Sequence, residues 1–306
     1  MQYAVGVDIG GTKTAIALVN ENGTIIESSI MPTNLTVTPQ QMVIKITNEI
    51  KRQMKVSRVT EEKMIGIGVG APGPIDNKKG TIVSPPNLKS WANFPIRDKL
   101  REQFSCPIIF ENDANAAALA EKWVGAGQGY QNFVFITIST GIGAGIVSDG
   151  RLLRGLVGNA GDIGHTVVDP SFGRCVCGQY GCLEWIASGT AIARQGSEIM
   201  GEELFTKDVF NLYFEGEQKI VTLIESVFQV LGAACVNLTN TFDTERIVIG
   251  GGVAQVGDHL FAAIRKYMQN YALGEQRRQT EIVPAKLNQN AGVIGAAALC
   301  FHDIHM

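Results

Sequence analysis

The chain carries little charge and few aromatic side chains: charged residues make up 18% and aromatic residues 7% of its 306 positions, and the net charge is −3. A small negative charge gives no electrostatic reason to expect nucleic acid or an anionic membrane as a partner. We find no uninterrupted apolar run long enough to span a bilayer, and no basic stretch before Asp8, so neither a membrane span nor a signal peptide is expected. A hydrophobic content of 45% is instead typical of a globular protein.

Cysteine is scarce outside one cluster. Of the six cysteines, Cys106, Cys235 and Cys300 are far apart in the sequence and are most simply buried thiols. A reducing, cytoplasmic location fits these thiols and also fits a thiolate metal site.

The remaining cysteines lie with a histidine in a short, glycine-rich stretch. His165, Cys175, Cys177 and Cys182 offer four soft nitrogen and sulfur donors. Four such donors favour a closed, tetrahedral structural zinc site, which leaves no position for a reactive water. The Cys-x-Cys spacing is tighter than in the usual zinc-finger pair, and the alternative is a set of buried thiols beside an incidental histidine.

Hydrophobic periodicity predicts an α/β chain with a mixed sheet. Thr38-Pro39-Gln40-Gln41 supplies an N-cap, a proline at the first helical position and a capping-box glutamine. In the first half, we expect strands at 3–9, 15–20, 64–70 and 107–111, and helices at 39–55 and 114–124. In the second half, we expect strands at 133–138 and 246–249, and helices at 219–241, 257–271 and 290–301.

A strand, a glycine-rich turn and a second strand occur near residue 3 and again near residue 133, which suggests an internal duplication. We therefore predict two similar α/β domains with a cleft between them. The smaller N-terminal domain would span 1–112, completed by the C-terminal helix (about 290–306), and the larger domain would span 113–289. The length of 306 residues is sufficient for two domains.

Three glycine-rich turns follow predicted strands, and together they suggest a bound nucleotide. Glycines let backbone N–H groups approach a phosphate, and Thr12 and Lys13 add a hydroxyl and a cation. Asp8 would need a cation beside those phosphates, which suggests Mg²⁺ held through water. A single glycine turn is more often only a turn. The residues predicted to bind nucleotide are Asp8, Gly10, Gly11, Thr12, Lys13, Thr140, Gly141, Gly251 and Gly252.

Asn112 and Asp113 follow a strand and open a helix. An aspartate there has a simple structural explanation, the helix N-cap. The functional alternative makes Asp113 a general base that takes a proton from an attacking hydroxyl, with Asn112 holding the same acceptor molecule.

In combination, these motifs resemble the ROK family of bacterial sugar kinases over essentially the whole chain. The motifs are Asp8-Ile-Gly-Gly-Thr-Lys, Pro86-Asn87-Leu88, Asn112-Asp113-Ala-Asn, Ser139-Thr-Gly-Ile-Gly, Gly164-His165 and Cys175-x-Cys-Gly-x-x-Gly-Cys182-Leu-Glu184. The resemblance implies the actin-like (ribonuclease H-like) ATPase fold. It implies an ATP-dependent kinase with Asp113 as catalytic base and zinc at the His165 cluster. It also implies sugar binding by Gly73, Asn87, Asn112, Asp162, His165 and Glu184.

The identity of the sugar is left open by the resemblance. We expect glucose, phosphorylated at its 6-hydroxyl, as the substrate. Glucose-type members usually have Glu where this chain has Asp162, so fructose, mannose, allose, N-acetylmannosamine and N-acetylglucosamine stay open as alternatives. Two other classes remain: a sugar-responsive repressor, which would need an N-terminal DNA-binding module before Asp8, and a non-catalytic member of the actin-like superfamily. Family members are commonly homodimers or homotetramers.

Overall fold

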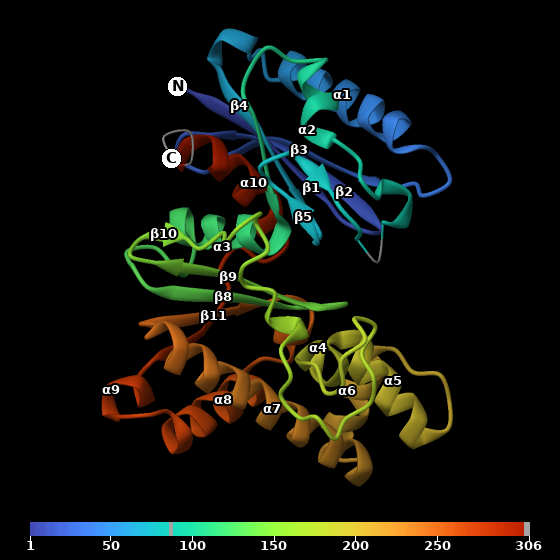
Figure 1. Cartoon of the computed structure of the whole chain (residues 1–306), viewed down its shortest axis with the longest axis vertical. Helices are drawn as coiled ribbons and strands as arrows, with labels where there is room; N and C mark the ends of the chain where they lie inside the picture. Colours follow the sequence, from blue (N-terminus) through green and yellow to red (C-terminus); the bar gives the residue numbers. More distant parts are fainter. Residues whose placement is uncertain (86–87, 303–306) are drawn as a thin grey trace. The chain divides into compact units, whose positions relative to one another are not determined.

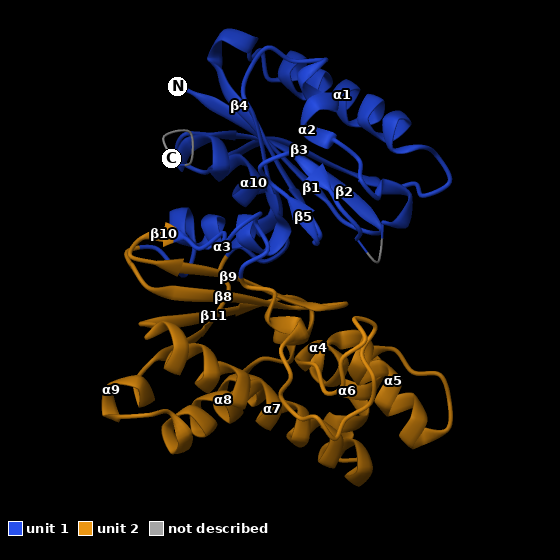
Figure 2. Ribbon diagram, viewed as in Figure 1, with its two compact units in different colours: residues 1–128, 152–160, 287–306 blue, residues 129–151, 161–286 orange. Residues whose placement is uncertain are grey.

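The computed structural model describes residues 1–85 and 88–302 and divides the chain into two compact units (Figures 1 and 2). Unit 1 consists of residues 1–128, 152–160 and 287–306, and unit 2 of residues 129–151 and 161–286. We expected the first boundary at residue 112, but the chain stays in unit 1 up to residue 128. The reason is that helix α3 (Asp113–Val124) packs against α10 (Ala291–His302) of the same unit. Residues 152–160 also return to unit 1, which the sequence did not indicate.

Unit 1 is built on a five-stranded sheet with the order β3-β2-β1-β4-β7. Its strands are β1 (Tyr3–Ile9), β2 (Lys13–Asn20), β3 (Ile25–Pro32), β4 (Met64–Ala71) and β7 (Ile108–Asn112). The first three strands are antiparallel, whereas β4 pairs parallel to β1 and β7 pairs parallel to β4. A two-stranded ribbon, β5 (Ile75–Asp76) with β6 (Thr81–Ile82), follows β4.

One face of this sheet packs against α1 (Pro39–Val56) and α2 (Ile96–Arg101). The predicted capping box is present: the N–H of Gln41 donates to the Thr38 hydroxyl, and the N–H of Thr38 donates to the Gln41 side chain. Because side chains alternate along a strand, Val5, Val7 and Ile9 of β1 face the apolar side of α1.

The opposite face of the sheet packs against α10 at very short range (Figure 1). A Cβ at Gly6 would overlap the backbone carbonyl of Val293, and one at Gly68 would overlap that of Ala296. Glycine at these two strand positions therefore lets the smooth, alanine-rich helix lie directly on the sheet. The same alternation puts Asp8 on the α10 face, next to the helix N-terminus.

Unit 2 is built on a second five-stranded sheet with the order β10-β9-β8-β11-β12. Its strands are β8 (Phe133–Ile138), β9 (Ile142–Ser148), β10 (Arg151–Leu152), β11 (Arg246–Gly250) and β12 (Glu281–Pro284). As in unit 1, the first strand of the unit has an antiparallel neighbour on one side and a parallel neighbour on the other. This shared pairing confirms the internal duplication.

Helices α4 (Leu183–Ala187), α5 (Gly189–Met200), α6 (Thr206–Glu215), α7 (Gln218–Phe242), α8 (Asp258–Tyr271) and α9 (Glu275–Arg278) complete unit 2. Among the described residues, α7 is the one helix long and apolar enough to cross a membrane by length and composition. Its buried residues, such as Ile224, Phe228 and Leu231, belong to the core of unit 2, which accounts for that composition.

Candidate functional site

The carboxylate of Asp8 lies against the N-terminus of α10. A Cβ at Gly292 would overlap this carboxylate, so only glycine allows the approach. The pKa of Asp8 is raised to about 7, first because the group is buried and then because of the negative charge of Asp113, while Lys13 acts in the opposite direction. A carboxylate that gives up its charge in this setting would regain it beside a cation.

The turn between β1 and β2 is tight and open to solvent. The N–H of Gly10 donates to the carbonyl of Lys13 at 2.9 Å. Thr12 and Lys13 are exposed, whereas Gly10 and Gly11 are partly buried. The side chains predicted to meet a phosphate are therefore presented by this turn rather than packed inside unit 1.

Asn112, rather than Asp113, is the N-cap of α3. The Asn112 side-chain oxygen accepts hydrogen bonds from the N–H groups of Ala114 (2.9 Å) and Asn115 (3.2 Å). Asp113 is the first helical residue, and its Oδ1 accepts from the N–H of Ala114 at 2.8 Å. The simple explanation for Asp113 as the N-cap is therefore insufficient, because another residue fills that role.

The loop that follows β4 is held close to Asn112. A Cβ added at Gly73 would lie 3.4 Å from Nδ2 of Asn112 and 3.6 Å from Oδ1 of Asn159. Asn159 accepts a hydrogen bond from the N–H of Ile75 (2.9 Å) and donates one to its carbonyl (2.8 Å). Gly73 and Asn112, both predicted sugar ligands, thus lie close together, and the motifs in the sequence did not indicate Asn159.

In unit 2, the β8–β9 turn and the end of β11 border one cavity of about 470 Å³. A Cβ at Gly251 would overlap the backbone of Ile138, so this glycine (φ +91°) permits the two strand ends to meet. Thr140 and Gly252, both predicted nucleotide ligands, line the cavity. The other lining residues are Ser139, Gly189, Thr190, Thr206, Lys207, Phe210, Asn211, Phe214, Val253, Gln255 and Val256.

Glu184 connects this turn to the cysteine-rich loop. Its Oε2 accepts a hydrogen bond of 2.8 Å from the N–H of Ile142. A Cβ at Gly141 would overlap the same carboxylate oxygen, and a Cβ at Gly164 would come within 3.3 Å of the Glu184 side chain. The glycines of two separate motifs therefore make room for one carboxylate.

The predicted metal ligands of unit 2 converge. One donor atom from each of His165, Cys175, Cys177 and Cys182 lies within 4.8 Å of the other three. The Nδ1 atom of His165 is 3.7 Å from Sγ of Cys175, and Sγ of Cys177 is 3.5 Å from Sγ of Cys182. With Zn–S bonds of about 2.3 Å, ligand atoms of a tetrahedral site are roughly 3.7 Å apart. The four residues therefore fit a zinc ion.

Asp162 and Asn87 are the remaining predicted sugar ligands. Asp162 is exposed and precedes the short 3₁₀ turn Ile163–His165, and its carbonyl accepts from the N–H of His165 at 3.3 Å. Asn87 lies outside the described residues.

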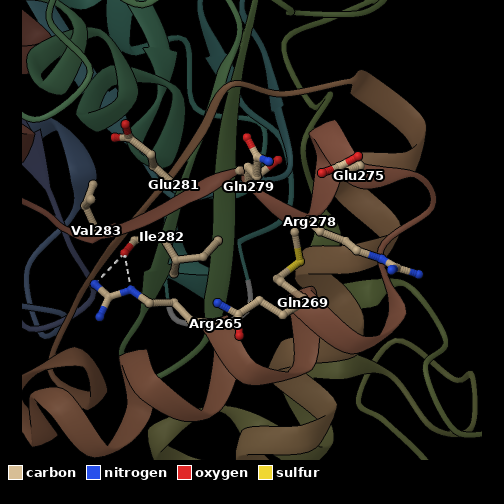
Figure 3. Close-up of a pocket in the computed structure, with 10 residues that line it drawn as sticks. Arg265, Gln269, Glu275, Arg278, Gln279, Glu281, Ile282 and Val283 are labelled. Carbon is tan, nitrogen blue, oxygen red and sulfur yellow. Dashed lines mark hydrogen bonds between the residues drawn. The ribbon is translucent and has the colours of Figure 1, made fainter.

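A second cavity of unit 2, of about 520 Å³, lies between α8, α9 and β12 (Figure 3). None of the described residues that line this cavity is a predicted site residue. Arg265 donates twice to the carbonyl of Ile282, at 3.1 and 2.7 Å, and Figure 3 shows the guanidinium of Arg278 on the opposite side. The two cations do not converge on a common ligand position.

The ROK family model matches residues 4–303. The chain belongs to the ROK family. It is 38% identical to a glucokinase of Halalkalibacterium halodurans, with 97% of this chain and 94% of the relative covered. Among solved structures, a ROK hexokinase from Thermus thermophilus is similar with a TM-score of 0.86, 34% identity and 97% of each chain covered. A ROK family glucokinase from Streptomyces griseus, solved with glucose and AMPPNP, is similar with a TM-score of 0.81 and 32% identity, with 97% of this chain and 98% of that one covered.

These similarities, together with the duplicated mixed sheets, confirm the predicted actin-like ATPase fold. The ROK family membership and the similarity to glucokinases also establish the class of activity, an ATP-dependent sugar kinase.

Proposed function

We propose that this ROK protein transfers the γ-phosphoryl group of ATP to the 6-hydroxyl of glucose. Asp113 takes the proton from the hydroxyl as the oxygen attacks the γ-phosphorus, and the bond to the bridging oxygen of ADP breaks. The observation that carries the proposal is the position of Asp113: a carboxylate in the first turn of α3, where Asn112 is the N-cap, in a chain similar to a glucokinase solved with glucose and AMPPNP. Phosphoryl transfer depends chiefly on positioning and on charge stabilisation.

The nucleotide is assigned to the glycine-rich turns. In this proposal Gly10, Gly11, Thr12, Lys13 and Asp8 of unit 1 serve the phosphates, and Thr140, Gly141, Gly251 and Gly252 of unit 2 serve the nucleotide as well. The cavity lined by Thr140 and Gly252 supports the second group. Mg²⁺ would offset the phosphate charge, and the raised pKa of Asp8 supports a cation beside this carboxylate.

Sugar hydroxyls are assigned to Gly73, Asn87, Asn112, Asp162, His165 and Glu184. Nδ1 of His165 is the ring nitrogen close to Cys175, which leaves Nε2 for a hydroxyl. Zinc at the four-residue cluster would fix the ring and the loop that leads to Glu184 on α4, and it would take no part in phosphoryl transfer.

A coupled assay of ADP release tests the proposal with glucose, fructose, mannose, allose, N-acetylmannosamine and N-acetylglucosamine. We expect glucose-dependent ADP release by zinc-replete wild-type protein and almost none by Asp113→Asn, which controls for contaminating kinases. Preference for another hexose would correct the substrate but keep the mechanism. ATP hydrolysis that ignores every sugar, or no ADP release with any sugar, would contradict the proposal and favour a non-catalytic or sugar-responsive role. We expect a homodimer or homotetramer, which light scattering after size exclusion measures.

A further inference from the structure

Glu111, the residue before Asn112, is a charged side chain that is only 1% exposed. Four donors meet its carboxylate. Arg154 Nε donates to Oε2 at 2.7 Å, and the backbone N–H of Asn112 donates to Oε1 at 2.9 Å. Asn115 Nδ2 donates to Oε1 at 3.2 Å, and Asn77 Nδ2 lies 3.5 Å from Oε2. Both oxygens are occupied, so Glu111 has no access to a substrate proton.

The donors come from three segments of unit 1 that are distant in sequence. Asn77 follows the loop that carries Gly73, Asn112 and Asn115 form the junction of β7 and α3, and Arg154 belongs to the returning segment 152–160. Other bonds join the same segments: Asn115 Nδ2 also donates to the carbonyl of Gly158 at 3.3 Å, and the N–H of Asn77 donates to the carbonyl of Val157 at 3.0 Å. Glu111 is thus the charged centre of a polar network around the Gly73 and Asn112 positions.

A buried ion pair of this kind contributes little net stability. Removing two charges from water costs about as much as their attraction returns, so an apolar pair would often stabilise the fold equally well. Such a pair does fix geometry, because moving Arg154 or the Asn112 peptide would cost the buried carboxylate one of its donors. The Asn112 peptide N–H is held directly, and the side chains of Asn112 and Asp113 follow that peptide in the chain.

We propose that Glu111, through its pair with Arg154, is a positioning residue that sets the orientation of Asn112 and Asp113 for the sugar hydroxyl. The inference rests on the proposed function, because it assigns those two side chains to the sugar. Loss of the pair would therefore affect sugar KM and kcat while leaving ATP KM nearly unchanged.

The test compares Glu111→Gln with a matched control, Glu121→Gln. Glu121 is a second buried carboxylate of unit 1, located on α3 itself, and it accepts from the N–H groups of Ala126 (2.6 Å) and Leu287 (2.9 Å). It lies eight residues, or about 12 Å, along the helix from Asp113. Steady-state kinetics are normalised to folded protein, and thermal unfolding is recorded for each variant.

We expect Glu111→Gln to lower kcat about 10- to 100-fold and to raise sugar KM several-fold, with ATP KM within 2-fold of wild type. Both variants should lower the melting temperature by similar amounts, but Glu121→Gln should keep kcat and both KM values within about 2-fold of wild type. If both variants lose only thermal stability, the positioning role is wrong. If wild-type protein phosphorylates no sugar, the proposed function itself fails, which is a separate result.

If Glu111→Gln does not fold, substitutions of Arg154 provide an independent test. The Arg154 side chain is 24% exposed, so replacing it disturbs the core less than replacing Glu111 does. Arg154→Met removes the cation and keeps much of the packing volume, whereas Arg154→Lys keeps a cation. We expect Arg154→Met to reproduce the kinetic pattern of Glu111→Gln and Arg154→Lys to recover at least part of kcat. Equal kcat values for the two Arg154 variants would overturn the role of the ion pair.

Discussion

The carboxylate of Glu184 accepts a hydrogen bond of 2.8 Å from the backbone N–H of Ile142, which places a predicted sugar ligand against the predicted phosphate-binding turn. Glu184 is the second residue of α4, which follows the cysteine-rich loop directly, and Ile142 is the first residue of β9. The orientation of one side chain therefore depends on two elements that the sequence separates by about forty residues. A change in the turn should consequently be transmitted to sugar binding.

Gly141→Ala tests this relationship. The added methyl group would overlap Oε2 of Glu184, so the carboxylate must move. We expect sugar KM to rise about 10-fold or more, because the displaced side chain no longer meets its hydroxyl. In a double-mutant cycle, adding Gly141→Ala to Glu184→Gln should cost little further in sugar KM, since both changes act on the same contact. Fully additive effects would show that the turn and Glu184 act independently.

Asp113→Asn should separate catalysis from binding. The amide keeps the size of the side chain but cannot accept the sugar proton, and a general base contributes roughly 10²–10⁴-fold to the rate. We therefore expect kcat to fall by about that factor while the dissociation constant for sugar, measured by calorimetry, changes by less than about 5-fold. A kcat within 10-fold of wild type would rule out Asp113 as the base.

Asp8 should make the stability of the metal-free protein depend on pH. Its pKa rises from 3.8 to about 7 on folding, because burial and Asp113 disfavour the charge. Between these two pKa values, the folded state holds a proton that the unfolded state has lost. The contribution of Asp8 to the free energy of unfolding is therefore most favourable below about pH 4 and declines as the pH rises to about 7. Asp8→Asn removes this penalty.

For Asp8→Asn in the presence of EDTA, we expect the free energy of unfolding at pH 8 to exceed that of wild type by about 1–2 kcal/mol, with a gain roughly one quarter as large at pH 4.5. The full linkage value would be larger, but Asp8 as a whole residue is only partly buried, so water near the carboxylate reduces the expected gain. Urea titrations at both pH values provide the measurement. An equal difference at the two pH values would exclude proton linkage at Asp8.

The sequence predicted the strands at the centre of both sheets and the longest helix of each unit, and it singled out the four residues of the metal cluster. The helix Pro39–Val56 was predicted because Thr38, Pro39 and Gln41 are local signals, read without any knowledge of the fold. The zinc cluster was predicted because its four ligands lie within eighteen residues of each other. The Gly73–Asn159 proximity and the Glu111–Arg154 pair were missed, because each joins distant segments through side chains that have no characteristic spacing. A single glutamate near the end of a strand gives no indication, in the sequence, of the residue with which it will pair.

Removal of zinc should affect the sugar more than the nucleotide. His165 and the loop leading to Glu184 depend on the four-ligand cluster, whereas Thr140 and Gly252 line their cavity without it. After treatment with a strong chelator, we expect sugar KM to rise about 10-fold and the melting temperature to fall by about 5 °C or more, with ATP KM changed less.

Metal analysis provides the complement to that experiment. Wild-type protein should contain one zinc per chain, and Cys177→Ser should lose most of it. Cys106→Ser, which alters a thiol outside the cluster, should retain the metal and the wild-type sugar KM. Zinc content unaffected by Cys177→Ser would show that the four residues do not form the site.

Asp162→Glu should move sugar preference towards glucose. Asp162 is exposed immediately before the turn that carries His165, and its carboxylate is one methylene shorter than the glutamate usual in glucose-type ROK members. A longer side chain at the same backbone position would reach further towards a hydroxyl, and a hydrogen bond to a substrate hydroxyl can discriminate strongly between sugars. We expect the ratio of kcat/KM for glucose over mannose and N-acetylmannosamine to increase several-fold in the variant, measured side by side with wild type. Because the change preserves charge, unfolding curves should coincide, so identical KM profiles for the two proteins would mean that Asp162 does not contact the sugar.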